Sequence, residues 1–221
     1  MRQKRQKLVL AIIPFAAVAL VPAAAYAANG VSAGSFSATL SPIPHDPTAD
    51  GGSNVTGHAS MTLTGRTLTV DLTASGLTPN EPHAMHIHGI TDQNNECPPA
   101  SADVNTGDPV DPNTPEIRGI PDGLISLAEG APFYGPIDVS LTATGSTAPS
   151  AGLTVSQFVT ADAAGNLSYH RTITVPKDVA KNMTNLHIVV HGTDLPADAD
   201  TSSLSSLFEA TLPVACGSIT R

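Results

Sequence analysis

The chain has 221 residues and is acidic, with 19 Asp and Glu against 10 Lys and Arg and a formal net charge of −9 at pH 7. It has no tryptophan and 4% aromatic residues. Nucleic acids and anionic membranes are bound through basic faces, so this charge balance argues against both as partners.

The first 27 residues have the pattern of a secretory signal. Four basic residues within the first seven precede an apolar stretch over 8–21, and Ala25-Tyr26-Ala27 is a small-x-small cleavage site. Cleavage would leave residues 28–221 as a single domain with six basic and nineteen acidic residues, about −13, secreted or held at the cell envelope. An uncleaved anchor is the alternative. No other stretch approaches the ~20 apolar residues of a membrane span, so we expect none in the mature chain.

The composition predicts an all-β fold. The chain is rich in Thr, Val and Ser, and it has 18 glycines and 19 prolines, which are typical of tight turns. Regular spacing of short strands favours an antiparallel sandwich or Greek-key barrel. The candidate strands are, in chain order, 35–40, 57–63, 67–74, 83–88, 137–144, 154–160, 167–175, 186–191 and 209–215.

Between these strands, little helix and two long loops are expected. One helical turn is predicted over 176–180, and apolar residues recur at helical spacing over 204–208. Residues 41–56 and 98–123 are rich in Pro, Asp, Asn and Gly, so they read as exposed loops, the second forming an insertion over about 98–130.

The two cysteines are Cys97 and Cys216. In an exported chain two cysteines are expected to form a disulfide, with two free thiols as the alternative. Such a bond would close a long loop, the case in which the chain-entropy model gives the largest stabilisation.

The motif with the clearest chemistry is His83-Ala-Met-His86-Ile-His88. Side chains alternate along a strand, so His86 and His88 would point the same way with Cα atoms roughly 6.6 Å apart, while Met85 and Ile87 would face the core. A third histidine, His191, ends the apolar run that starts at Leu186. Imidazole nitrogen suits copper and zinc, so the pattern predicts a metal site built on strands.

These residues resemble the Cu/Zn superoxide dismutases. The stretch from Thr67 to Cys97 contains a strand, Gly76-Leu77, the histidine motif and a loop to a cysteine, and Val189-Val-His191 precedes a long acidic loop and Ala215-Cys216-Gly217. The front half, from Phe36 through Gly89, also resembles secreted CHRD domains, which are similarly β-rich.

The dismutase resemblance implies a Greek-key barrel in which His86, His88 and His191 bind copper and Cys97 pairs with Cys216. His83 would be a structural histidine facing away from the metal. If the protein is active, its substrate would be a small anion, with copper reduced by one superoxide and reoxidised by the next.

Two departures from the dismutase pattern bear on activity. No histidine lies between Cys97 and His170, so the bridging and zinc histidines are missing and we expect no zinc. Pro213 stands where the dismutases place an arginine before the final Ala-Cys-Gly. A guanidinium would favour the anion through charge-assisted hydrogen bonds, so its loss should slow dismutation substantially.

The remaining histidines are expected to lie outside the metal site. His187 shares a face with His191 but lies roughly 13 Å along the strand, too far for one ion, and is interpreted as an edge or surface residue. His45 and His58 are interpreted as surface residues, and His170 is unplaced.

The insertion contains a second, interrupted metal pattern. Residues 103–106 resemble the start of a twelve-residue EF-hand loop and 122–129 resemble its remainder, with 107–121 as an excursion between them. An acidic, solvated loop is the alternative. The calcium ligands predicted by this pattern are Asp103, Asn105, Asp122, Ser126 and Glu129.

Two functions are therefore weighed. The first is a secreted copper-binding, dismutase-like protein with weak or no activity. The second is a non-enzymatic CHRD-type domain whose histidines are structural and whose long loops bind a partner. A serine hydrolase is a distant third, because no Gly-x-Ser-x-Gly elbow occurs.

Overall fold

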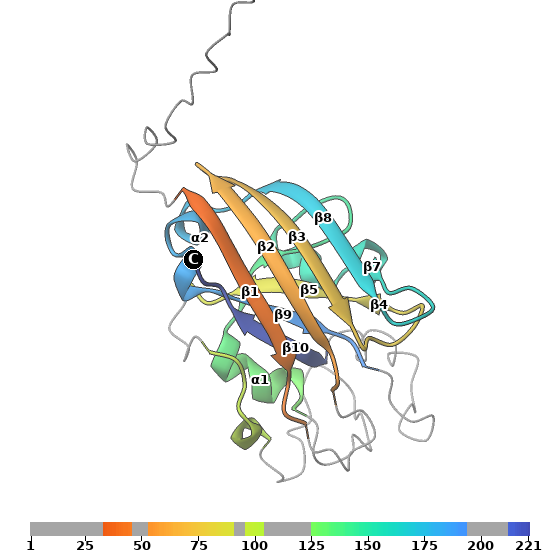
Figure 1. The fold of residues 1–221 in the computed structure, drawn as a ribbon. Coiled ribbons are helices and arrows are strands. Elements are labelled where there is room, and N and C mark those ends of the chain that lie inside the picture. The colour runs from red at the N-terminus through yellow and green to blue at the C-terminus, as the bar shows by residue number, and fades with distance from the viewer. Residues whose placement is uncertain (1–32, 46–52, 91–95, 104–124, 194–211) are drawn as a thin grey trace, which may run out of the picture.

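A computed structural model describes residues 33–45, 53–90, 96–103, 125–193 and 212–221. Ten strands form the framework of this part of the chain (Figure 1). They are β1 (Gly34–Pro42), β2 (Thr56–Thr64), β3 (Thr67–Ser75), β4 (Pro82–His83), β5 (Met85–His88), β6 (Ile137–Ser140), β7 (Val159–Thr160), β8 (Leu167–Thr174), β9 (His187–His191) and β10 (Pro213–Ser218).

Eight of these strands form one curled antiparallel sheet in the order β6-β5-β9-β10-β1-β2-β3-β8, and β4 pairs with β7 separately. In Figure 1 the strands β1, β2, β3 and β8 form a front layer, and β10, β9 and β5 cross behind it. β1 belongs to both layers, because it pairs with β2 along Gly34–Leu40 and with β10 through Ser41 and Pro42. The predicted all-β fold is confirmed.

The front strands alternate between inward residues, which are mostly apolar, and outward polar residues. In β1, Phe36, Ala38 and Leu40 are buried and the Ser and Thr residues between them face outward. Burying one face of each strand stabilises the sheet, and a one-residue slip would expose the whole apolar set. The main core lies between the layers and includes Leu63, Leu68, Val70, Leu72, Met85, Ile87, Ile173, Ile188 and Val190.

Helices are few in the described part of the chain. The turn predicted over 176–180 is confirmed as α2 (Lys177–Lys181), whereas α1 (Leu127–Tyr134) was not predicted. Four short 3₁₀ helices complete the structure: η1 (Ala100–Ala102), η2 (Pro149–Leu153), η3 (Val155–Gln157) and η4 (Met183–Asn185). The helical spacing noted over 204–208 lies outside the described residues, as does the signal sequence.

Four predicted strands differ from the observed ones. The strand predicted over 83–88 is two strands, β4 and β5, which pair with different neighbours. The strand predicted over 137–144 ends at Ser140, and 154–160 is mostly 3₁₀ turn with only β7 extended. Backbone hydrogen bonds from Ala151 to Ala148 and from Gln157 to Thr154 close these turns, so β-branched residues there have no neighbouring strand to pair with. β10 runs to Ser218, three residues beyond the predicted end.

The predicted disulfide between Cys97 and Cys216 is present, with a Cα–Cα distance of 5.7 Å. It ties the segment before η1 to β10. A second apolar cluster surrounds it on the outer side of the back layer, built from Ile43, Ala102, Ile125, Tyr134, Val189 and Cys216. In the described ranges no helix has the length and apolar character needed to cross a bilayer.

Candidate metal centre

The strand β5 places its histidines on the outer side of the back layer. All four of its residues are buried, with Met85 and Ile87 in the main core as predicted, so His86 and His88 point the other way. There the segments that include α1 and η2 cover them. A metal ion bound on this face would therefore have the sheet on one side and these segments on the other.

Pairing of β5 with β9 brings the third histidine to the same place. His86 lies opposite Val189 and His88 opposite His187, so His191 is a diagonal neighbour of His86. The ring centroids of His86 and His191 are 4.9 Å apart, and those of His88 and His191 are 6.3 Å apart. One nitrogen from each of these three histidines lies within 4.8 Å of the others. The predicted convergence is confirmed.

Backbone carbonyls fix the orientation of two of these rings. The Nε2 of His86 lies 3.1 Å from the carbonyl of Gly152, and the Nδ1 of His88 lies 3.0 Å from the carbonyls of Gly135 and Pro136. In a neutral imidazole the nitrogen facing a carbonyl carries the proton and the other carries the lone pair. His86 thus offers Nδ1 to a metal and His88 offers Nε2.

The nitrogens assigned to the metal lie at the centre of the cluster. The Nδ1 of His86 is 3.2 Å from the Nε2 of His191. The Nε2 of His88 is buried and has no hydrogen-bond partner among the described residues. A buried nitrogen without a partner is costly, and a metal ion at this point would satisfy it.

The surroundings of His86 and His88 keep these two imidazoles neutral. Burial, together with the neighbouring His191 and His88, holds the pKa of His86 well below its usual 6.5. Burial, His191 and His187 lower the pKa of His88 to about 3. Because a metal binds the neutral form of imidazole, both side chains are in the protonation state that a metal site would need at neutral pH.

Tyr134 and Gly152 form the walls of the site, and neither was predicted. The Tyr134 ring lies 4.9 Å from the His88 ring and 6.2 Å from the His191 ring, and its hydroxyl donates to the carbonyl of Leu127. A Cβ at position 152 would lie 2.8 Å from the Nε2 of His86, so only glycine permits this close approach. The sequence Ser126-Leu-Ala-Glu129, a capping-box spacing, was the signal that could have located the helix carrying Tyr134.

His83 has the structural role that was predicted for it. It is buried in β4, and its ring contacts the carbonyls of His191 and Thr78 at 3.0 and 3.1 Å. A Cβ on Gly192 would lie 2.3 Å from the His83 ring. His83 therefore holds the backbone at the end of β9, where His191 lies, through its contacts with His191 and Gly192.

The interpretation of His187 as an edge or surface residue is wrong. His187 is 1% exposed, and its ring stacks parallel to that of His88 at 6.0 Å between centroids. Burial lowers its pKa to about 4, and a backbone hydrogen bond to Tyr134 acts in the opposite direction. As predicted, it does not belong to the cluster of His86, His88 and His191. It lies directly beside that cluster, against the ring of His88.

His45 was also expected at the surface and is instead buried. Its Nε2 donates to the carbonyl of Pro213, and its Nδ1 accepts from the backbone of Ile125, both at 2.8 Å. The docking of the segment before α1 buries it. His58 is exposed, as predicted, and His170 lies on the outer face of β8 beside Asp71.

Two of the predicted calcium ligands have a structural role at the start of α1. Ser126 is the N-cap, and the side chains of Ser126 and Glu129 bond reciprocally to each other's backbone N–H. Asp103 and Glu129 both lie near enough to His45 to oppose the lowering of its pKa by burial. Asn105 and Asp122 lie outside the described residues, so the calcium site stays a prediction.

Comparison with protein-family models gave no match, and comparison with curated proteins gave no significant similarity. The resemblance to the dismutases and to CHRD domains thus depends on the residues quoted above.

Proposed function

We propose that this chain is a copper-binding protein of the Cu/Zn superoxide dismutase-like type, with His86, His88 and His191 as the ligands. The single observation that carries the proposal is the convergence of one nitrogen from each within 4.8 Å. The partnerless Nε2 of buried His88 supports it further.

Copper is the metal that this donor set favours. Imidazole nitrogen binds borderline ions, and among first-row divalent metals the affinity of such a site peaks at copper. The bridging and zinc histidines of the dismutases have no counterpart between Cys97 and His170, which speaks against a paired zinc ion.

The protein residues would hold and enclose the metal. Carbonyls from Gly152, Gly135 and Pro136 keep the rings of His86 and His88 turned toward the centre. Bound copper would supply a one-electron couple for reaction with superoxide. Pro213, opposite His191 in the sheet, offers no charge to attract an anion, so we expect dismutation to be slow or absent.

A structural role for the histidines is the second candidate, and one observation favours it. The three rings are 1–3% exposed, and the contact between the Nδ1 of His86 and the Nε2 of His191 serves as an internal hydrogen bond when no metal is bound. In that case the protein would be a CHRD-type binding domain whose function lies in its long loops.

Metal content separates the two candidates. Purified protein loaded with copper and then desalted should retain one copper per chain, with an electron paramagnetic resonance spectrum showing nitrogen ligands. His86→Ala and His191→Ala should each weaken copper binding more than ~100-fold, since even outer-shell partners of a metal alter its affinity by about 10–100-fold. Secondary structure should change little.

His170→Ala is the matched control, because His170 is exposed and lies on the other layer. It should leave copper binding unchanged. Protein that emerges free of copper after loading would favour the structural role, and full copper affinity in both ligand variants would exclude the site.

A further inference from the structure

The outer face of the front layer is covered with hydroxyl groups. Every outward position of β1, β2, β3 and β8 is Ser or Thr except His58, Asp71 and His170. The pairing register aligns them in rows across the sheet, one of which runs Thr39, His58, Thr73 and Ser168. This face lies on the opposite layer from the histidine cluster.

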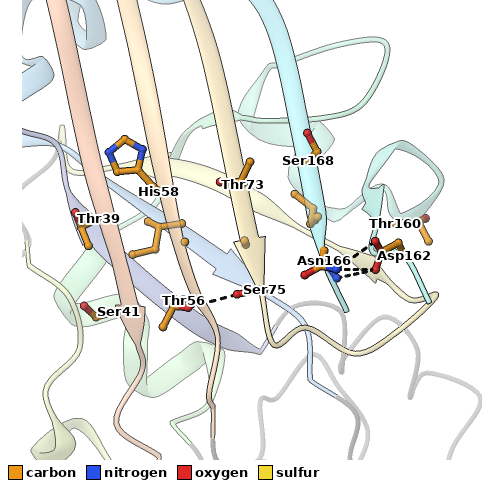
Figure 2. Close-up of a pocket in the computed structure, with 14 residues that line it drawn as sticks. Thr39, Ser41, Thr56, His58, Thr73, Ser75, Thr160, Asp162, Asn166 and Ser168 are labelled. Carbon is orange, nitrogen blue, oxygen red and sulfur yellow. Dashed lines mark hydrogen bonds between the residues drawn. The ribbon is translucent and has the colours of Figure 1, made fainter. Parts of the chain in front are cut away.

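One end of this face is hollowed into a groove of about 800 Å³. Figure 2 shows its floor, formed by the row from Thr39 to Ser168, with Thr160, Asp162 and Asn166 from the β7–β8 segment beside it. The Asp162 carboxylate is occupied by that segment itself, because it accepts hydrogen bonds from Ala164 and Asn166. Those hydrogen bonds fix the conformation of the turn that forms the wall of the groove.

The hydroxyls on the floor are available to a ligand. Thr39, Thr73 and Ser168 are exposed and make no side-chain hydrogen bond to another described residue. Each hydroxyl can donate one hydrogen bond and accept two. His58 adds a flat ring in the middle of the row (Figure 2).

The chemistry of the groove selects the class of ligand. Leu40 and Leu167, which lie beneath the groove, are 1% and 2% exposed. Its apolar surface therefore comes mainly from the carbon atoms of the exposed Thr, Ser and His side chains, which can pack against the CH groups of a ligand. No Lys or Arg lines the groove, and the chain is acidic overall, which disfavours an anion. A neutral ligand rich in hydroxyls matches these groups.

We propose that this groove binds a neutral oligosaccharide chain. Neighbouring strands lie about 4.8 Å apart, so a row presents polar groups at a spacing comparable to the length of one sugar ring. A glycan lying across β1, β2, β3 and β8 would meet a hydroxyl or the His58 ring at each strand. The turn that contains Asp162 and Asn166 would set the shape of the wall beside which the glycan lies.

Titration calorimetry with four soluble neutral probes tests the proposal: cellohexaose, maltohexaose, xylohexaose and N-acetyl-chitohexaose. At least one should bind the full-length protein saturably. Thr73→Val removes a hydroxyl from the centre of the floor while keeping the β-branched shape, and Thr73→Lys also obstructs the groove. We expect affinity to fall about tenfold in the first variant and further in the second, because several hydrogen bonds depend on this position.

Thr62→Val and Thr62→Lys are the matched controls, since Thr62 is exposed on the same face but does not line the groove. Both should bind the probe as the unaltered protein does, and copper content should be unchanged in all four variants. Failure of every neutral probe at millimolar concentration would overturn the proposal. Equal affinity in the Thr73 variants, or binding of an acidic glycan such as alginate only, would overturn it as well.

Discussion

Histidines in this fold differ because their burial differs. His86, His88 and His187 are enclosed by α1, η2 and the back layer, and burial lowers the pKa of each. His170 stays on the surface, with its Nδ1 2.5 Å from an Asp71 carboxylate oxygen. One residue type thus supplies the candidate metal ligands, a structural support and a surface side chain within one domain.

His45 makes the stability of the protein depend on pH. Burial lowers its pKa below 6.5, and its Nδ1 accepts from Ile125, so protonation in the folded state would remove an acceptor. The unfolded state takes up a proton near pH 6.5, so this contribution to stability is complete above that pH and is lost as the pH falls toward the lower folded pKa. The loss has a limiting slope of about 1.4 kcal/mol per pH unit.

His45→Gln tests this, because glutamine can keep both hydrogen bonds and does not titrate. Urea unfolding of the metal-free protein at about pH 7.5 and about pH 5.5 should show a smaller loss of stability in the variant. Equal losses in the two proteins would contradict the assignment.

The cluster of His86, His88 and His191 could be predicted from spacing, because strand alternation places two of them together. His187 was misjudged for a physical reason. The distance along β9 separates it from His191, but pairing with β5 sets it opposite His88, and a single strand considered by itself does not reveal that partner. His45 was misjudged because the segment that buries it lies far away in the sequence.

At the scale of elements, α1 has the largest effect on the candidate metal centre. It brings Tyr134 to the histidines and begins with the capping box of Ser126 and Glu129. Gly130 and Pro132 make this helix difficult to predict from the sequence, since both residues are poor helix formers. Gly130 is required there, because a Cβ would lie 2.5 Å from the Tyr134 ring. The alternating strands could be predicted from the sequence. The one local signal for this helix, the capping-box spacing from Ser126 to Glu129, is also compatible with the predicted calcium loop.

Calcium binding can be tested without breaking the helix cap. If the predicted ligands bind calcium, saturating calcium should raise the melting temperature, with about 2.7 kcal/mol of stabilisation at a hundred times the Kd. The double variant Asp122→Asn, Glu129→Gln should lose this effect while the glutamine keeps the capping box. Calorimetry with and without calcium measures it.

Asp178→Asn on α2 serves as the control and should respond to calcium as the unaltered protein does. Unchanged melting in millimolar calcium would end the calcium assignment.

At the scale of the molecule, the disulfide joins two positions that are far apart in the sequence. Cys97 and Cys216 are separated by 119 residues. Removing the bond with Cys97→Ser and Cys216→Ser should lower the free energy of unfolding by about 4–5 kcal/mol in the chain-entropy model. Urea unfolding of the double variant measures this loss.

The unaltered protein under reducing conditions should match the double variant, since both lack the cross-link. A loss below about 1 kcal/mol would contradict the chain-entropy expectation and would indicate that the unfolded chain keeps structure without the bond.

The pairing of β1 with β10 joins the first described strand to the last. Nearly all of the chain must therefore be synthesised before β1 and β10 can pair and join the two layers. Closure over such a distance is entropically slow, on a scale of about milliseconds to seconds for comparable β topologies. Until then the free edge of β1 is open to pairing with other chains, so overproduction of the protein invites aggregation before assembly is complete.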